Sequence, residues 1–248
     1  MADAVFAFTA IDAGQRSDGA RFARQPDACH PGDVVISTGD SALWEGCDPG
    51  IADAVQQALK ELGDKGVRIS STAMPEVQEA IQLLRGGGVG EAEFDEFLTS
   101  ELPEWRETLD PLVSQRILNA GSLPAVEYLR RRRLIGQLQQ SAPQRFEECD
   151  VIASPTVPIT QPKLEDVSEE AGYGPLNLMS LRNTCAANVL GLCSITLPVG
   201  LDAAGMPVGL QLLAPHNGED KLLSVALCIE GLIGNSNDRL GKPPAISS

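Results

Sequence analysis

Apolar and polar positions in the C-terminal third of the chain follow the pattern of a β-hairpin. Ser194–Val199 is an apolar run with many β-branched residues, and a second apolar run covers Val208–Ala214. Between the two runs, Asp202–Gly205 has the composition of a turn. The pattern predicts two antiparallel strands that are mostly buried.

A strand–helix–strand unit is predicted further upstream. Val34–Ser37 and Val67–Ser70 are short strand candidates. Asp48-Pro49 supplies an N-cap followed by a proline at the first helical position, and apolar residues then recur at helical spacing from Ile51 to Leu62. This order predicts a right-handed crossover between two parallel strands.

The same reasoning predicts the remaining elements. One helix is predicted to begin at Pro75. Further helices are predicted over Phe94–Ser100, Leu109–Asn119, Leu123–Glu148, Leu176–Val189 and Asp220–Ile233, and a buried strand over Asp150–Ser154. Gly86–Gly90 is predicted to be a turn between helices, because the Lys-Ser/Thr of a phosphate loop does not follow it. Gln161–Pro175 is predicted to be a surface loop. The fold class is therefore α/β, with a mixed β-sheet and helices on both faces.

The chain divides into three predicted segments. Residues 1–33 are expected to be irregular, residues 34–233 to form the α/β domain, and residues 234–248 to form a polar tail. At 248 residues the chain is long enough to bury a substantial core.

Composition argues against several classes of protein. A net charge of −15 disfavours nucleic-acid binding, and the basic run Arg130–Arg133 is expected to be a solvated or interface face of a helix. We see no apolar run of membrane-spanning length and no signal-peptide pattern, so we expect a cytoplasmic protein that does not contact a membrane. Six cysteines without CxxC spacing and two histidines predict reduced thiols and no metal site.

The arrangement of residues around the hairpin says more about function. The motif begins with an Asn and a Gly, continues with an apolar strand that ends in Pro-x-Gly, and closes with Gly-x-Pro-x-Gly-x-Gln. Its residues are Asn188, Gly191, Pro198, Gly200, Gly205, Pro207, Gly209 and Gln211. This order strongly resembles the C-terminal part of the amidase signature family, although Cys193 and Ser194 stand where that family usually has Pro-Ala.

Two further segments resemble the same family. Arg116, Gly121, Tyr128 and Arg133 match an ordered set of family residues, and the 150–154 strand is followed by Pro155-Thr156 as in the family. The resemblance runs in order from about residue 34 to residue 233, and it is most specific over residues 150–214.

The resemblance implies hydrolysis of a carboxylic amide to an acid plus ammonia or an amine. Family members use a nucleophilic Ser, a bridging Ser and a neutral Lys, without a metal or organic cofactor. The Gly/Ser-rich stretch that carries these residues precedes the part matched here, and we find no such stretch in this chain. Ser70-Ser71 is the only internal Ser-Ser pair and lacks flanking glycines, so we expect a turn there and assign no catalytic residue.

Three explanations account for a pocket-bearing half without its nucleophile. We favour a truncated reading frame or an expressed fragment. The alternatives are a chain that pairs with a separate chain carrying the catalytic half, and a decayed relative of the family. In the third case it acts as a non-catalytic binding or assembly module. An exposed sheet edge can also pair with a second copy of the chain, so a homo-oligomer is a further possibility.

The resemblance suggests Arg116, Thr156 and Asn188 as contacts for a small amide substrate. Arg116 is a candidate partner for a substrate carboxylate, Thr156 follows a sheet strand, and Asn188 is a candidate for holding a turn beside the site. Each also has a local interpretation, as a surface helix residue, a turn cap and a local hydrogen-bonding side chain. Leu181 stands where amidotransferase subunits tend to have an Asp, which favours a stand-alone hydrolase of less polar amides over an amidotransferase subunit.

Overall fold

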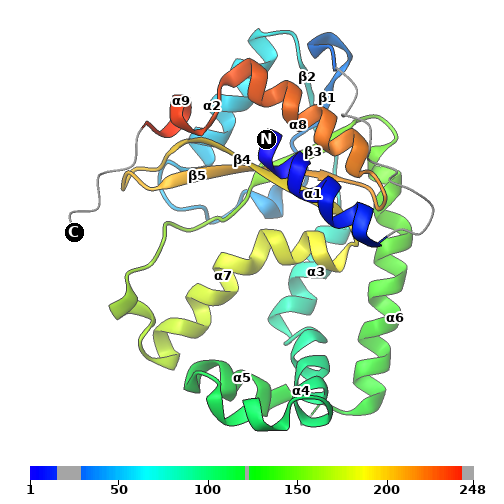
Figure 1. Cartoon of the computed structure of the whole chain (residues 1–248), viewed down its shortest axis with the longest axis vertical. Coiled ribbons are helices and arrows are strands. Elements are labelled where there is room, and N and C mark those ends of the chain that lie inside the picture. Colours follow the sequence, from blue (N-terminus) through cyan, green and yellow to red (C-terminus); the bar gives the residue numbers. More distant parts are fainter. Residues whose placement is uncertain (16–28, 121–122, 242–248) are drawn as a thin grey trace.

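A mixed β-sheet runs through the upper part of the molecule in Figure 1. The computed structural model describes residues 1–15, 29–120 and 123–241. The strands are β1 (Val35–Ser37), β2 (Arg68–Ser70), β3 (Val151–Pro155), β4 (Cys193–Leu201) and β5 (Pro207–Ala214), in the order β2-β1-β3-β5-β4.

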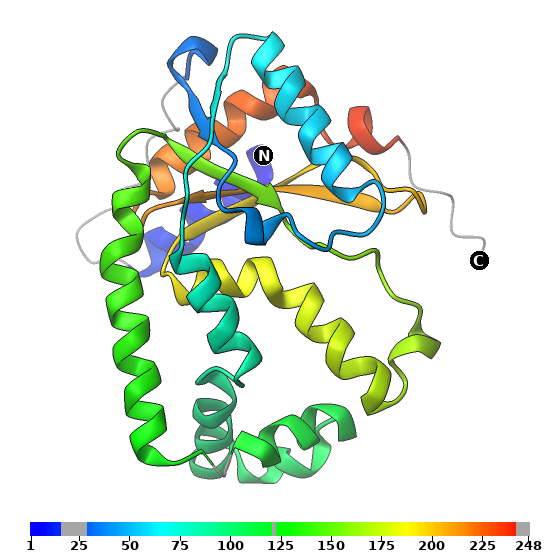
Figure 2. The same ribbon diagram turned by 180° about the vertical axis from the view of Figure 1, so that it is seen from behind.

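Helices lie on both faces of this sheet, as predicted. They are α1 (Ala2–Gln15), α2 (Ile51–Asp64), α3 (Glu76–Arg85), α4 (Gly90–Ser100), α5 (Pro111–Ala120), α6 (Ala125–Ser141), α7 (Glu170–Val189), α8 (Glu219–Ile233) and α9 (Ser236–Leu240). Helices α2 and α8 cover one face, whereas α3, α6 and α7 extend from the other (Figures 1 and 2). Short 3₁₀ turns cover Pro31–Asp33, Ser41–Leu43, Pro103–Thr108, Ala142–Phe146 and Leu164–Val167.

The predicted crossover unit is present. Strand β1 pairs in parallel with β2, with Ile36 opposite Ile69, and α2 connects them. Strand β1 also pairs in parallel with β3, so the carboxyl ends of these strands lie at one edge of the sheet. Ligands of α/β proteins commonly bind outside that edge.

The predicted hairpin is also present. Strands β4 and β5 pair antiparallel from Cys193 opposite Ala214 to Leu201 opposite Pro207, with an irregularity between Pro198 and Gly200. Asp202 Oδ1 closes the turn by accepting from the backbone N–H groups of Ala204 (2.9 Å) and Met206 (2.8 Å). Strand β5 also pairs antiparallel with β3, so β4 is left at the edge of the sheet.

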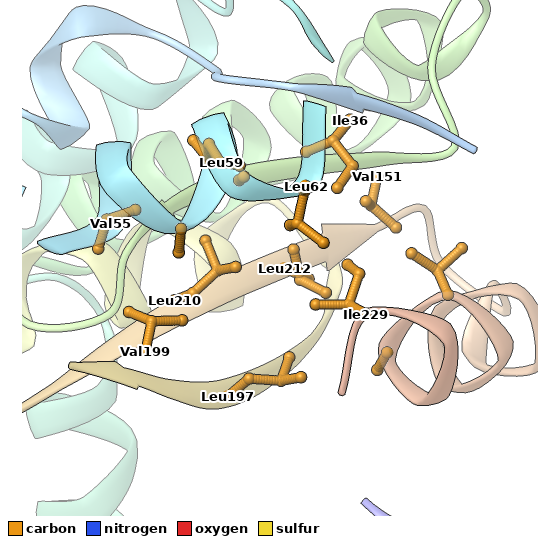
Figure 3. Close-up of a cluster of buried hydrophobic side chains, with 14 of the residues drawn as sticks. Ile36, Val55, Leu59, Leu62, Val151, Leu197, Val199, Leu210, Leu212 and Ile229 are labelled. Carbon is orange, nitrogen blue, oxygen red and sulfur yellow. The ribbon is translucent and has the colours of Figure 1, made fainter. Parts of the chain in front are cut away.

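Side chains that alternate along the strands pack into two hydrophobic cores, one on each face of the sheet. Leu197, Leu210 and Leu212 point toward α2 and α8, where they meet Leu62 and Ile229 (Figure 3). Burying apolar side chains of this size contributes about 1.5–3 kcal/mol each. The second core lies on the opposite face. It contains Leu43, Ile152, Leu213 and the inward residues of α3, α6 and α7.

The N-terminal segment predicted to be irregular and the predicted polar tail each contain a helix. Residues 2–15 form α1, which the sequence did not reveal because its apolar residues follow no helical period; alanines support the helix instead. Helix α9 lies in the predicted polar tail, capped by Asn235, whose Oδ1 accepts from Asn237 N (2.8 Å). Residues 16–28 and 242–248 of these segments lie outside the described residues, and the division into domains stays a prediction.

The predicted loop over residues 161–175 is partly wrong. Helix α7 begins at Glu170, six residues before the predicted start, and contains Pro175. Pro175 is the sixth residue of α7, where it removes one backbone hydrogen bond and crowds the carbonyl of Ala171, yet the helix continues through it.

Candidate functional site

A cavity of about 490 Å³ opens where β3 leaves the sheet and the β4–β5 hairpin turns. Thr156 follows β3 directly, Thr196 and Pro198 come from β4, and Gly209 comes from β5. Ser180 of α7 also lines it. The cavity lies at the carboxyl-end edge of β1 and β3, where the fold class leads one to expect a ligand.

Two hydroxyl groups meet on the floor of this cavity. Thr156 Oγ1 and Thr196 Oγ1 are 3.1 Å apart, although they are 40 residues apart in the sequence. Strand β5 lies between them, and Thr156 N–H donates to Gly209 O (2.9 Å). A Cβ on Gly209 would lie 2.6 Å from Thr196 Cγ2 and 2.7 Å from Thr156 Oγ1, so only glycine leaves room for both side chains.

A pair of aspartates holds the loop that follows Thr156. Thr160 N–H donates to Asp48 Oδ2 (2.8 Å), and Thr160 Oγ1 donates to Asp202 Oδ2 (2.7 Å). Asp48 N–H donates back to Pro158 O (2.8 Å). Burial by itself would raise the pKa of Asp202, but the hydrogen bonds from Thr160 and from the turn backbone bring that pKa below its usual range. Asp202 is therefore ionised at neutral pH.

Two buried polar residues of α7 hold the end of β3 from the other side. Asn183 Nδ2 donates to Pro155 O (2.6 Å) and to Leu43 O (2.9 Å). Arg182 donates to Glu45 O (2.7 Å), to Leu43 O (3.2 Å) and to Asn183 Oδ1 (2.9 Å). Burial lowers the pKa of the Arg182 guanidinium. This cluster fixes the peptide that leads into Thr156.

A row of polar side chains, buried at Ser154 and Gln211 and exposed at Thr196, crosses three strands beside the cavity. Ser154, Gln211 and Thr196 stand opposite one another on β3, β5 and β4. Gln211 is 1% exposed, and neither its Nε2 nor its Oε1 has a hydrogen-bond partner among the described residues. Buried polar groups normally have hydrogen-bond partners, so the Gln211 amide is an unsatisfied donor and acceptor within the described residues.

The three predicted contact residues do not come together. Thr156 follows β3 and is among the residues that line the cavity. Asn188 is exposed in the last turn of α7, where its carbonyl accepts from Gly191 N–H (3.1 Å), and it is not among the residues that line this cavity. Arg116 belongs to α5, far from the sheet in Figure 1, and its side chain lies outside the described residues. Their roles stay predictions.

Thr196, Gly209, Asp202 and Asn183 were not predicted as site residues. For Thr196 a signal was present: Ser194, Thr196 and Pro198 alternate with apolar residues, so a less apolar face of the strand was visible in the sequence. The Asn183 contacts had no local signal, because its partners lie in distant loops.

In residues 1–15, 29–120 and 123–241, no group of three or more His, Cys, Asp or Glu side chains is arranged to hold a metal ion. The helices described there include none with the length and apolarity needed to cross a membrane. Two further cavities, of about 500 and 440 Å³, lie among α3, α4, α6 and α7, and α5 also lines the smaller one.

Comparison of the sequence with known families finds a match to the family described as Amidase over residues 11–223. The chain is 36% identical over 241 residues to a 2-amino-5-chloromuconic acid deaminase of Comamonas testosteroni, covering 97% of this chain and 51% of that protein. It is 30% identical over 250 residues to a fatty acid amide hydrolase of Oryza sativa subsp. indica, covering 93% and 40%. The chain thus spans about half the length of these curated relatives or less.

Solved structures support the fold. An allophanate hydrolase of Kluyveromyces lactis matches 90% of this chain and 37% of its own, with a TM-score of 0.70 and 21% identity. A 6-aminohexanoate cyclic dimer hydrolase matches 90% and 50%, with a TM-score of 0.68 and 19% identity. At these identities the likeness establishes the α/β architecture, not the substrate.

Proposed function

The chain belongs to the amidase family, and on that premise we propose that it supplies the substrate-pocket half of a serine-dependent amidase. The reaction is hydrolysis of a carboxylic amide to an acid plus ammonia or an amine. A serine hydroxyl outside these 248 residues attacks the carbonyl carbon, the amine leaves with a proton, and water then hydrolyses the ester. By itself the chain is inactive.

The content of the 490 Å³ cavity carries this proposal. Its described lining offers threonine and serine hydroxyls and apolar walls, but no Lys or His that would serve as a base beside a nucleophile. The hydroxyls of Thr156 and Thr196 hydrogen-bond to each other, and Ser180 Oγ donates to Asn177 O (2.9 Å). Such a cavity binds and orients a ligand without providing acyl transfer.

The open side of the sheet supports the same interpretation. Strand β4 lies at the sheet edge, and its Ser194 and Thr196 are exposed. An edge of this length is commonly covered by another strand or segment. The length of the relatives is consistent with a catalytic segment of comparable size that completes the site, either upstream in the same protein or on a separate chain. We further propose a cytoplasmic protein, in keeping with six free thiols.

A fluorophosphonate, which labels activated serines, tests the proposal by intact-mass analysis. The purified chain is expected to gain no adduct. The chain joined to a segment that carries the Gly/Ser-rich stretch, encoded in frame upstream or in a neighbouring gene, is expected to gain one adduct per molecule on that segment. A stoichiometric adduct on the chain alone would place the nucleophile within these residues and contradict the proposal. No adduct in either form would favour the alternative, a non-catalytic binding or assembly module.

A further inference from the structure

The charge of the cavity is one-sided. Among the described residues that line it, Asp202 is the single charged side chain. Asp48 adds a second carboxylate just behind the lining, because it accepts from Thr160 N–H at 2.8 Å while Asp202 accepts from the Thr160 hydroxyl at 2.7 Å. A carboxylate placed in this cavity would meet like charge without a cation to offset it.

The buried cation on α7 donates its hydrogen bonds to groups outside the cavity. Arg182 directs its guanidinium N–H groups to the carbonyls of Leu43 and Glu45 and to the side chain of Asn183. It is 6% exposed and does not line the cavity. Arg182 therefore holds backbone in place and presents no N–H group to a ligand there.

The hydroxyl pair, in contrast to Asp202, carries no charge. Each threonine hydroxyl is able both to donate and to accept a hydrogen bond, and the two lie 3.1 Å apart above the bare backbone of Gly209. A carboxamide likewise presents a donor and an acceptor side by side. The surrounding walls include Ile51, Met206 and Val208, which suit an apolar chain.

We propose that Thr156 and Thr196 together bind the polar end of an uncharged ligand group in this cavity, and that Asp202 makes the cavity reject carboxylates. The inference rests on the proposed function in one respect: it states which part of an amide substrate this chain binds. That part is a neutral group on an apolar body, not an acidic one.

Hexanamide and hexanoate test the proposal, since they share a chain length and differ in charge. The ¹⁵N-labelled chain is titrated with each compound at pH 7 while backbone amide resonances are followed by NMR. Hexanamide is expected to cause saturable shifts at Thr156, Thr196 and Gly209, and hexanoate is expected to bind at least tenfold more weakly. Equal or tighter binding of hexanoate overturns the proposal, and so does an absence of saturable shifts with hexanamide.

Single substitutions separate the two parts of the inference. Thr196→Val keeps the shape of the side chain and is expected to weaken hexanamide binding about fivefold through loss of a hydrogen bond. Thr99→Val is the matched control, because the Thr99 hydroxyl donates to Asp95 O on α4 (2.7 Å), and it is expected to leave binding unchanged. If Thr196→Val does not fold, as judged by circular dichroism, Thr196→Ser takes its place and is expected to retain binding. Weakening by Thr99→Val equal to that of Thr196→Val overturns the assignment.

Asp202→Asn tests the rejection of carboxylates. The amide keeps an acceptor for the turn backbone and a donor for the Thr160 oxygen, so the turn is preserved. We expect hexanoate to bind about fivefold more tightly to this variant, through loss of one screened charge, and hexanamide binding to change less than twofold. Unchanged hexanoate binding in a folded variant overturns the role of Asp202.

The two proposals fail separately. Selective hexanamide binding without fluorophosphonate labelling in any form leaves this inference standing and removes the catalytic one. Labelling of the joined protein together with equal binding of hexanamide and hexanoate leaves the catalytic proposal standing and overturns this inference.

Discussion

Gly209 decides, at the scale of single residues, whether the hydroxyls of Thr156 and Thr196 can meet. The absence of a side chain there is a packing requirement, because any Cβ would enter the space of both threonines. The resemblance to amidases marks this glycine as part of a motif, and the structure supplies a physical reason for a glycine in this chain.

Gly209→Ala is expected to destabilise the protein by about 1–3 kcal/mol through overpacking, and to separate the two hydroxyls. Gly200→Ala is the matched control, because a Cβ there would lie 3.6 Å from Ala54 Cβ, an ordinary contact. Urea unfolding followed by circular dichroism measures both. A Gly209→Ala variant as stable as Gly200→Ala would contradict the packing argument.

The thiol of Cys149 gives the protein a pH dependence at the same scale. Cys149 is 8% exposed, and burial, together with the nearby carboxylates of Asp150 and Glu148, raises its pKa from 9.0 to about 11. Between pH 9 and pH 11 the folded state therefore binds more protons at this site than the unfolded state does. Stability contributed by the protonated thiol is present below pH 9 and is lost as the pH rises through this window.

We expect the free energy of unfolding to fall by about 2 kcal/mol more in the wild type than in Cys149→Ala between pH 9 and pH 11. Urea titrations at several pH values measure the difference, which cancels the effects of the other five cysteines. Parallel curves for the two proteins would show that the Cys149 pKa is not raised by folding.

Helix α7 has two roles at the scale of elements. Its apolar residues Ala186 and Ala187 pack into the second core, while Arg182 and Asn183 hold backbone carbonyls of two distant loops. The helix thus connects the segment after β1 with the end of β3. The cavity keeps its shape because both loops are tied to one rigid element.

Asn183→Leu is expected to destabilise the protein by about 1–3 kcal/mol, because the carbonyls of Pro155 and Leu43 lose a buried donor. It is also expected to speed proteolysis of residues 156–162, because this loop loses its anchor at Pro155 and keeps only the contacts of Thr160 and Pro158 with the two aspartates. Thr184→Val on the same helix removes a hydroxyl that donates to Leu181 O (3.2 Å), and it serves as the control. Limited proteolysis with mass spectrometry reports both; equal cleavage rates would count against an anchoring role.

The sheet determines behaviour at the scale of the whole molecule. Strand β3 is fully buried between β1 and β5, whereas β2 and β4 are the outer strands. One side of β4 is capped near its end, where Arg239 Nη2 donates to Val199 O (2.9 Å). The stretch of β4 before Val199 has no strand on its outer side among the described residues.

Hydrogen exchange is therefore expected to be slowest in β3 and fast at alternate amides of β4, where N–H groups point away from β5. Joining the proposed catalytic segment is expected to slow exchange in residues 194–197 at least tenfold while leaving β2 unchanged. Peptide-resolved mass spectrometry makes the measurement. Unchanged exchange in a joined protein that labels with fluorophosphonate would mean that the segment completes the site without covering this edge.

The sequence by itself determined the elements whose signal lies in consecutive residues. The hairpin, the crossover β1–α2–β2 and the amphipathic faces of α2 and α3 were predicted because burial of one face imposes a period on neighbouring positions. Thr156 was predicted as a substrate contact because it follows a buried strand in a recognisable motif; the structure places it in the lining of a cavity, and its contact with substrate stays a prediction. Helix α1 was missed because it lacks such a period.

Only the tertiary structure decided which side chains meet. Thr156 and Thr196 come together through the pairing of β3 with β5 and of β5 with β4, and a shift of one residue in either register would turn one hydroxyl to the opposite face. Asn183 reaches Pro155 across 28 residues of sequence. Local patterns specify which faces of helices and strands are buried. Contacts between distant segments depend on how those faces pack together, which is determined by the fold as a whole.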